Sequence, residues 1–232
     1  MKIVDVKAYP TSYRVPKELQ VSLGIGTMTK RDCVMVKVTT EDGITGWGES
    51  HHARSPGSIG HLINTTLKGF VVGMDATDTV GIWAKIYKFQ LGSHGMGAAT
   101  AMAMSGLDQA LWDIKGKAVG WPLYKLLGGS NRPVPAYAGG ISLGYQEPKS
   151  LVAEAEPMVE AGYKALKLRI GDTVRADIAR MTAIRKRFPD SAILTDANTG
   201  YTVEDVRRVM PAMDELGIAW LEEPFPAHDH RS

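Results

Sequence analysis

The second half of this chain alternates between short apolar runs and amphipathic segments, a pattern that few folds accommodate. The expected strands cover 134–138, 165–170, 192–196 and 218–222, and the expected helices cover 148–161, 174–188 and 203–216. Repeated βα units with short loops predict a parallel sheet with right-handed crossovers. A complete barrel has eight such units in roughly 250 residues. We therefore predict an α/β fold containing the first half of a (β/α) TIM-type barrel, strands 1–4, and expect the sequence to be part of a longer protein. The alternative, an open four-stranded sheet, has a far edge that nothing in the composition covers.

In the first half, strand-like segments come first and helical segments follow, which predicts a separate α+β domain. A β-meander is expected over residues 1–50, followed by helices. The expected strands are 2–10, 34–39 and 44–49, the expected loops are 16–30 and 51–57, and the expected helices are 59–72, 77–91, 98–119 and 123–127. Gly128 and Gly129 end the last helix. The predicted domains are therefore an N-terminal α+β domain over 1–128 and a partial barrel over 129–232.

Composition excludes several classes of protein. The 232 residues carry a formal net charge of +2 with the charges mixed, so nucleic acid is not an expected partner. A single cysteine, Cys33, excludes an intrachain disulfide and favours a cytoplasmic setting. The N-terminus has no signal-peptide pattern, and no apolar run approaches the roughly 20 residues of a membrane helix. The sequence therefore predicts a cytoplasmic protein that does not bind membranes.

Two carboxylates stand where expected strands end. Asp196 closes one apolar run and Glu222 closes the next. Neighbouring strands lie about 4.8 Å apart, so carboxylates at consecutive strand ends can converge on one ion, and Mg²⁺ prefers such oxygen ligands. The alternative is that both residues cap helices or pair with lysines. Asn198 follows Asp196 by two residues and is expected to face the same cavity, where its amide would bind a substrate oxygen or orient a ligand. The alternative is that Asn198 is a helix N-cap or a loop residue.

Two cations stand on an earlier expected strand. Lys167 and Arg169 are two residues apart, so both point to the same face of the strand. With the intervening leucine packed against the helix layer, both cations are expected inside the barrel mouth. Buried cations need anions, which the metal carboxylates and an anionic substrate would supply. A purely structural ion pair with Asp196 or Glu222 is the alternative.

The motifs along the chain resemble those of the enolase superfamily, in its mandelate racemase and muconate lactonizing enzyme branch. The segments that carry the resemblance are Gly46-Trp47-Gly48-Glu49, 107–117, Leu126-Leu127-Gly128-Gly129, Lys167-Leu168-Arg169, Thr195-Asp196-Ala197-Asn198 and Trp220-Leu221-Glu222-Glu223-Pro224. The resemblance implies that the N-terminal domain is a capping domain. It also implies that Asp196 and Glu222 are metal ligands at the ends of the third and fourth barrel strands.

The resemblance also implies a reaction. A carboxylate substrate binds Mg²⁺, a base removes the proton α to the carboxylate, and positive charge stabilises the enolate. The family's third metal ligand and its His-Asp dyad lie on later strands, which these residues do not include. Arg169 stands where the family often has a second lysine, and arginine is a poor base. Lys167 remains a candidate base, and Arg169 and the metal are expected to lower its pKa.

These inferences favour an Mg²⁺-dependent lyase that dehydrates an acid sugar or related hydroxy acid, with Lys167 and Arg169 as catalytic residues. The alternatives are a racemase, epimerase or cycloisomerase of the same fold, or a catalytically inactive fragment. His51 and His52 fall in a loop that in this family reaches over the barrel mouth, so they are expected to contact substrate, although simple solvent exposure would explain them equally well. The expected partners are a small-molecule carboxylate and further copies of the same chain.

Overall fold

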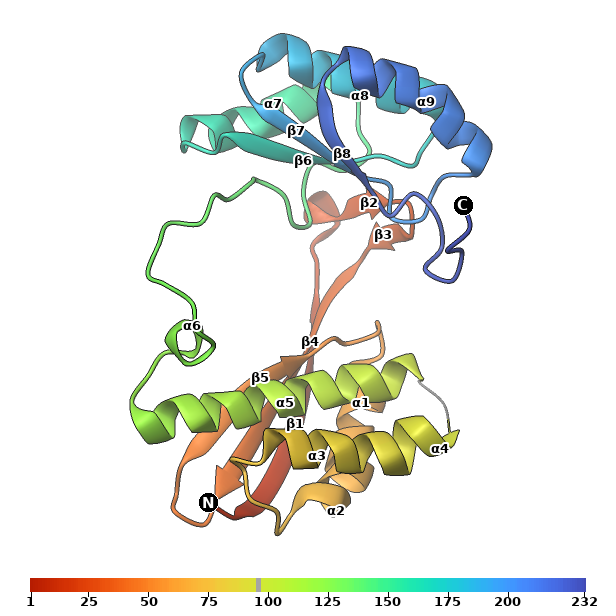
Figure 1. The fold of residues 1–232 in the computed structure, drawn as a ribbon. Coiled ribbons are helices and arrows are strands. Elements are labelled where there is room, and N and C mark those ends of the chain that lie inside the picture. The colour runs from red at the N-terminus through yellow and green to blue at the C-terminus, as the bar shows by residue number, and fades with distance from the viewer. Residues whose placement is uncertain (95–96) are drawn as a thin grey trace. The chain divides into compact units, whose positions relative to one another are not determined.

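The structure is a computed structural model that describes residues 1–94 and 97–232. The chain forms two compact units (Figure 1). The first unit contains Met1–Arg14 and Lys30–Arg132, and the second contains Val15–Thr29 and Pro133–Ser232. The domain limits expected from the sequence, 1–128 and 129–232, stay a prediction.

The first unit is built on an antiparallel meander, as its alternating apolar residues predict. Its strand order is β1-β4-β5, and its strands are β1 (Ile3–Arg14), β4 (Lys30–Thr40) and β5 (Thr45–Ser50). Val34, Val36 and Val38 are fully buried at every second position of β4, on the face that the helices cover. At Gly48 a β-carbon would lie closer than 3.0 Å to the backbone of Gly106, so only glycine allows the long helix to approach β5 this closely.

The helices of the first unit follow the predicted positions, with two interruptions. They are α1 (Pro56–Leu62), α2 (Lys68–Val71), α3 (Thr79–Ile86), α4 (Gly92–His94), α5 (Ala98–Val119) and α6 (Leu123–Leu126). A π-helical turn joins α1 to α2 at Ile63–Leu67, and another follows α3 at Tyr87–Leu91. The helix expected over 98–119 is confirmed to the residue.

The segment 16–30, which the sequence predicted to be a loop, is a β-hairpin. A short 3₁₀ turn (Lys17–Leu19) precedes β2 (Val21–Leu23), which pairs antiparallel with β3 (Gly26–Met28). Strands of three residues have too few positions for an alternating pattern to be recognised, so the loop prediction was wrong. The hairpin belongs to the second unit, where the backbone N–H of Tyr145 donates to the Ser22 carbonyl at 3.1 Å.

The second unit contains a parallel sheet covered by helices on one face (Figure 1). The order is β6-β7-β8, and its elements are α7 (Pro148–Glu160), β6 (Ala165–Arg169), α8 (Val174–Arg187), β7 (Ala192–Asp196), α9 (Val203–Glu215) and β8 (Ile218–Glu222). Leu166, Leu168 and Ile170 are fully buried in the core beneath the helices. These βα units confirm the predicted alternation of strands and helices in a partial barrel.

The first expected barrel strand, 134–138, is the exception. Only Ala138 pairs with the sheet, through a single parallel bridge to Leu166, and Val134 is 79% exposed. Pro133 and Pro135 flank Val134 and have no N–H groups for a strand ladder, so the prediction that Val134 joins the sheet was wrong. Within residues 1–94 and 97–232, no helix has the length and apolar character needed to cross a bilayer.

Candidate active site

The carboxyl ends of three neighbouring strands carry the charged residues singled out by the sequence. The strand register places Arg169 beside Asp196, and Asp196 beside Glu222. Lys167 lies two residues before Arg169, so its side chain emerges on the same face of the sheet. The structure therefore brings together Lys167, Arg169, Asp196 and Glu222, called the charged cluster below.

The Lys167 ammonium lies between the two carboxylates. Its Nζ is 3.0 Å from Asp196 Oδ2 and 2.7 Å from Glu222 Oε1. Lys167 and Asp196 are buried, with 6% and 2% of their surfaces exposed. Oxygens from two strands thus converge on one positive charge, as carboxylate ligands of a hard divalent cation do. Asp196 and Glu222 fit an Mg²⁺ site in this respect. The structural ion pairs considered as an alternative are also present.

Arg169 is held from several sides. One of its terminal nitrogens donates to Asp196 Oδ2 and, at 3.2 Å, to Asn198 Oδ1, and the other donates to the carbonyl of Gly140. The Asn198 backbone N–H in turn donates to Asp196 Oδ1 at 2.9 Å. Asn198 adopts a positive φ of 43°, a conformation that asparagine tolerates better than most residues. These bonds fix Asn198 next to the charged cluster.

The carboxylates reverse the pKa direction expected for Lys167. Burial lowers the pKa of Lys167, but the hydrogen bonds and charges of Glu222 and Asp196 outweigh burial and raise it above its ordinary value. The sequence-based expectation of a lowered pKa counted Arg169 and a metal ion and omitted the direct carboxylate contacts. That expectation was wrong for the charges that the structure contains.

Two aromatic residues beside Lys167 were missed by the sequence analysis. The rings of Tyr137 and Trp220 meet edge to face with centroids 6.0 Å apart, and the Lys167 Nζ lies 5.9 Å from the Tyr137 ring centroid. Trp220 is two residues before Glu222 on β8, so strand alternation was a usable signal for its position. Tyr137 gave no such signal, because its segment does not form a regular strand.

His51 and His52 lie in the first unit, whereas the charged cluster lies in the second. Their rings stack with centroids 4.6 Å apart. Each Nδ1 accepts a backbone N–H, from Ala53 at 3.1 Å and from Arg54 at 2.9 Å. These acceptor roles assign the proton of each neutral ring to Nε2, which makes both Nε2 atoms donors. Burial lowers the pKa of His52, which favours its neutral form. Contact of either residue with substrate stays a prediction.

The hairpin β2–β3 adjoins the candidate site within the second unit. A β-carbon on Gly24, in its turn, would lie closer than 3.0 Å to the carbonyl oxygens of Ala197 and Asn198. The hairpin turn thus rests directly on the backbone beside the charged cluster.

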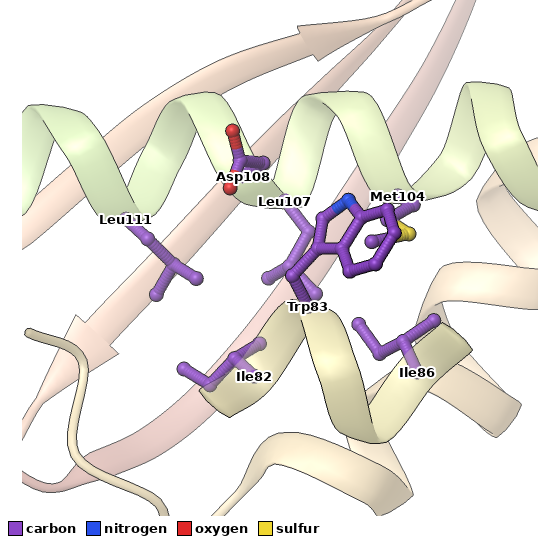
Figure 2. Close-up of a pocket in the computed structure, with 7 residues that line it drawn as sticks. All are labelled: Ile82, Trp83, Ile86, Met104, Leu107, Asp108 and Leu111. Carbon is purple, nitrogen blue, oxygen red and sulfur yellow. The ribbon is translucent and has the colours of Figure 1, made fainter. Parts of the chain in front are cut away.

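A separate cavity in the first unit has neither the size nor the chemistry of a substrate site. Figure 2 shows it between α3 and α5, with one carboxylate among apolar side chains. The residues that line it are Ile82, Trp83, Ile86, Met104, Leu107, Asp108 and Leu111. Its volume is about 10 Å³, close to the minimum for one water molecule. Burial raises the pKa of Asp108. Within the described parts of the chain, no three His, Cys, Asp or Glu residues are grouped to hold a metal ion.

Comparison with known protein families identifies the family to which this chain is related. The family described as mandelate racemase / muconate lactonizing enzyme, N-terminal domain, matches residues 6–128, and the family described as enolase C-terminal domain-like matches residues 150–232. The chain belongs to the enolase superfamily. Its α/β architecture, with an N-terminal capping domain and part of a barrel, agrees with that of solved superfamily members. The family resemblance inferred from the sequence motifs is thereby confirmed.

The chain is similar to several named enzymes and solved structures of the superfamily. The chain is 34% identical to an arabinonate dehydratase of Saccharolobus solfataricus, covering 96% of this chain and 61% of the relative. It is 34% identical to a D-galactarolactone cycloisomerase of Agrobacterium fabrum, covering 97% and 59%. A solved enolase superfamily structure from Polaromonas sp. JS666 is 53% identical, with a TM-score of 0.95 over 99% of this chain and 60% of that chain. The chain thus spans about three fifths of the length of these relatives.

Proposed function

We propose that this chain supplies the cation-binding and carboxylate-binding part of an active site that dehydrates an acid sugar or related hydroxy acid. The observation that carries the proposal is the convergence of Asp196 and Glu222 on one positive charge, beside Arg169. Asp196 and Glu222 would hold Mg²⁺, which when bound supplies Lewis-acid stabilisation of negative charge. A solved dipeptide epimerase from Enterococcus faecalis, 26% identical to this chain with a TM-score of 0.83, is complexed with Mg and a dipeptide.

The cations of the cluster bind and stabilise negative charge in this proposal. Arg169 stays protonated at any ordinary pH. Lys167, whose ammonium contacts both carboxylates, is the second cation and would lie beside the substrate carboxylate. Asn198 uses its side-chain oxygen to accept from Arg169, so its amide nitrogen is the atom that would donate to a substrate oxygen. These residues favour formation of the enolate because the charge that develops there meets fixed positive groups.

Dehydration follows from the electron movement at the substrate. A base takes the α-proton, and the electron pair of the broken C–H bond enters the enolate. That pair then forms a carbon–carbon double bond as the β-hydroxyl leaves with its bonding pair and takes up the proton held by the base, so that water is released and the base is restored. By family resemblance, the base in this proposal is a histidine on a later barrel strand. Arg169 in place of a second lysine favours chemistry with one base, and hence dehydration over racemisation.

Cycloisomerisation is the second candidate. The support for it is a named cycloisomerase with the same 34% identity as the dehydratase. Both reactions would use the same cation-binding and charge-stabilising residues, so the charged cluster does not discriminate between them. The identity of the product discriminates between the two reactions.

Cation binding by the chain is the first test. We expect Mn²⁺, a spectroscopic substitute for Mg²⁺ at oxygen ligands, to bind with one site per chain in electron paramagnetic resonance titrations. The double variant Asp196→Asn, Glu222→Gln removes both negative charges without changing shape, and its affinity should fall at least about tenfold. Glu223→Gln, adjacent on the chain, is the matched control and should bind as the wild type does. Equal affinity of the double variant and the wild type would exclude these two residues as ligands.

Activity is tested in a chimera that joins residues 1–232 to the part of the Polaromonas relative that follows the matched region. The chimera is incubated with Mg²⁺ and a panel of aldonic and aldaric acids and their lactones. Dehydration should yield a 2-keto-3-deoxy acid, detected as its semicarbazone, and Asp196→Asn should lower the rate at least about 100-fold. An isomeric product without loss of water would support the cycloisomerase candidate. Turnover unaffected by Asp196→Asn would overturn the assignment of the charged cluster.

A further inference from the structure

Asp177, on α8, is a completely buried carboxylate that the proposed chemistry does not use. Its Oδ2 accepts the backbone N–H groups of Gly171 at 3.0 Å and Asp172 at 3.1 Å, and the Tyr201 hydroxyl at 2.7 Å. Its Oδ1 accepts from Arg180 at 2.8 Å. Burial raises the pKa of Asp177, and the hydrogen bonds from Tyr201, Gly171 and Arg180 oppose that effect. A buried carboxylate with this many partners is an organising centre for the groups that donate to it.

Three of the four donors to Asp177 come from two different loops, and the fourth, Arg180, lies on α8 itself. Gly171 lies two residues after the end of β6, and Tyr201 lies in the loop between β7 and α9. The two loops touch through their backbones: a β-carbon on Gly171 or on Gly200 would lie closer than 3.0 Å to the facing loop. Gly171 also has a φ of 96°, in the region that favours glycine. Asp177 accepts hydrogen bonds from both loops and therefore helps to hold them at this close approach, beside the direct backbone bond from the Ile170 N–H to the Asp196 carbonyl at 3.0 Å.

The loop after β7 leads directly to the charged cluster. Asn198, three residues before Tyr201, donates its backbone N–H to Asp196 and accepts from Arg169 through its side chain. The same loop is bonded to the segment after β8, because the Thr199 N–H donates to the Glu223 carbonyl at 2.7 Å. A shift of this loop would therefore move groups that orient the Asp196 carboxylate.

We propose that Asp177 and Tyr201 form a clamp that positions the cation site by locking the loops after β6 and β7 together. Both are positioning residues: they act through the backbone of Asn198 and touch neither carboxylate ligand. The inference rests on the proposed function for its binding readout. Its second readout, amide exchange, needs no cation.

Tyr201→Phe tests the clamp in the full chain, because it deletes one hydroxyl and keeps the ring. We expect the Mn²⁺ affinity to fall about tenfold, as is typical when a group that orients a ligand is lost. Amide hydrogen exchange at Asn198 and Thr199 should accelerate by a similar factor. Tyr145→Phe is the matched control, since the Tyr145 hydroxyl also donates within this unit, to the Ile170 carbonyl at 2.9 Å, without bonding to the loop after β7. We expect Tyr145→Phe to change either quantity less than twofold, as for a residue without a positioning role.

The outcomes separate the clamp from the cation site. If the wild type binds no Mn²⁺, the proposed cation site is wrong, and exchange at Asn198 and Thr199 alone decides the clamp. If Tyr201→Phe lowers only the melting temperature, with affinity and exchange unchanged, Tyr201 is merely structural and the clamp is wrong. Asp177→Asn is the second variant. It places an amide NH₂ against existing donors, and it should produce effects at least as large as Tyr201→Phe.

Discussion

At the scale of single residues, the candidate site is governed by charge balance. Lys167 is almost completely buried and contacts both carboxylates, while Asp196 also receives Arg169. Removing one partner from such a buried set leaves a charge without compensation, which costs more than the pair itself contributes. In the proposed function the same two oxygens would hold a divalent cation, so the ammonium would compete with that cation for them. Stability and cation affinity should therefore respond in opposite directions to its removal.

Lys167→Met tests this opposition. We expect the free energy of unfolding to fall by about 2–4 kcal/mol, because Asp196 and Glu222 lose a buried partner. We also expect Mn²⁺ to bind about tenfold more tightly, because a neighbouring positive charge has been removed. Urea unfolding with and without Mn²⁺, together with titration calorimetry, measures both quantities. Lys186→Met, at an exposed site on α8, is the control and should change neither. An affinity for Mn²⁺ that did not rise in Lys167→Met would show that the ammonium does not compete for the cation position.

At the scale of elements, N-cap hydrogen bonds in the first turn stabilise two helices of the second unit, α8 and α9. Thr202 caps α9 with a full capping box: its hydroxyl accepts the Asp205 N–H at 3.2 Å, and the Asp205 carboxylate accepts the Thr202 N–H at 3.0 Å. Thr173 caps α8 with a single bond from the Ala176 N–H at 3.3 Å. The two threonines form a matched pair that differs in the reciprocal carboxylate bond.

Thr202→Ala should destabilise the protein by about 1 kcal/mol, and Thr173→Ala by less, because only the first variant loses a reciprocal box. Hydrogen bonds from Thr202 lower the pKa of Asp205 below its ordinary value of 3.8. A lowered folded-state pKa stabilises the fold at pH values above 3.8, and this contribution is lost as the pH falls through the folded-state pKa. The difference between Thr202→Ala and the wild type should therefore be full at neutral pH and shrink in acid. Urea titrations followed by circular dichroism measure it. A difference that grew in acid would contradict the assigned direction.

At the scale of the whole molecule, the chain has two hydrophobic cores, one in each unit. Val36 is fully buried in the core of the first unit, and Leu168 is fully buried in that of the second. Cores that are built from different segments can open separately. Association into oligomers and a cytoplasmic location stay predictions at this scale.

Leu168→Ala should lower the stability of the second unit by about 2–5 kcal/mol, because it leaves a cavity in a packed core. We expect amide exchange to accelerate in β6 and β7, while β4 keeps the protection it has in the wild type. Val36→Ala is the reciprocal variant and should accelerate exchange in the first unit. Equal acceleration in both units after either substitution would mean that they unfold as one cooperative structure.

Much of the fold follows from patterns that are local in the sequence. The helix expected over 98–119 matches α5, and three of the four expected barrel strands form β6, β7 and β8. The two-residue spacing of Lys167 and Arg169 correctly predicted a common face, because successive side chains on a strand alternate. The family was likewise accessible from the motifs alone. The predictions failed where a segment was short or carried prolines, at hairpin 16–30 and at Val134.

The sequence by itself determined which residues stand at the strand ends, because strand and helix periods are properties of neighbouring residues. Only the tertiary structure decided what those residues do to one another. The pKa direction of Lys167 depends on carboxylates from two other strands, and the Asp177–Tyr201 bond joins residues that are 24 positions apart. No periodic pattern encodes such contacts, since their energy arises from the distance between groups and their burial, and both are fixed only when the strands pair and the helices cover them.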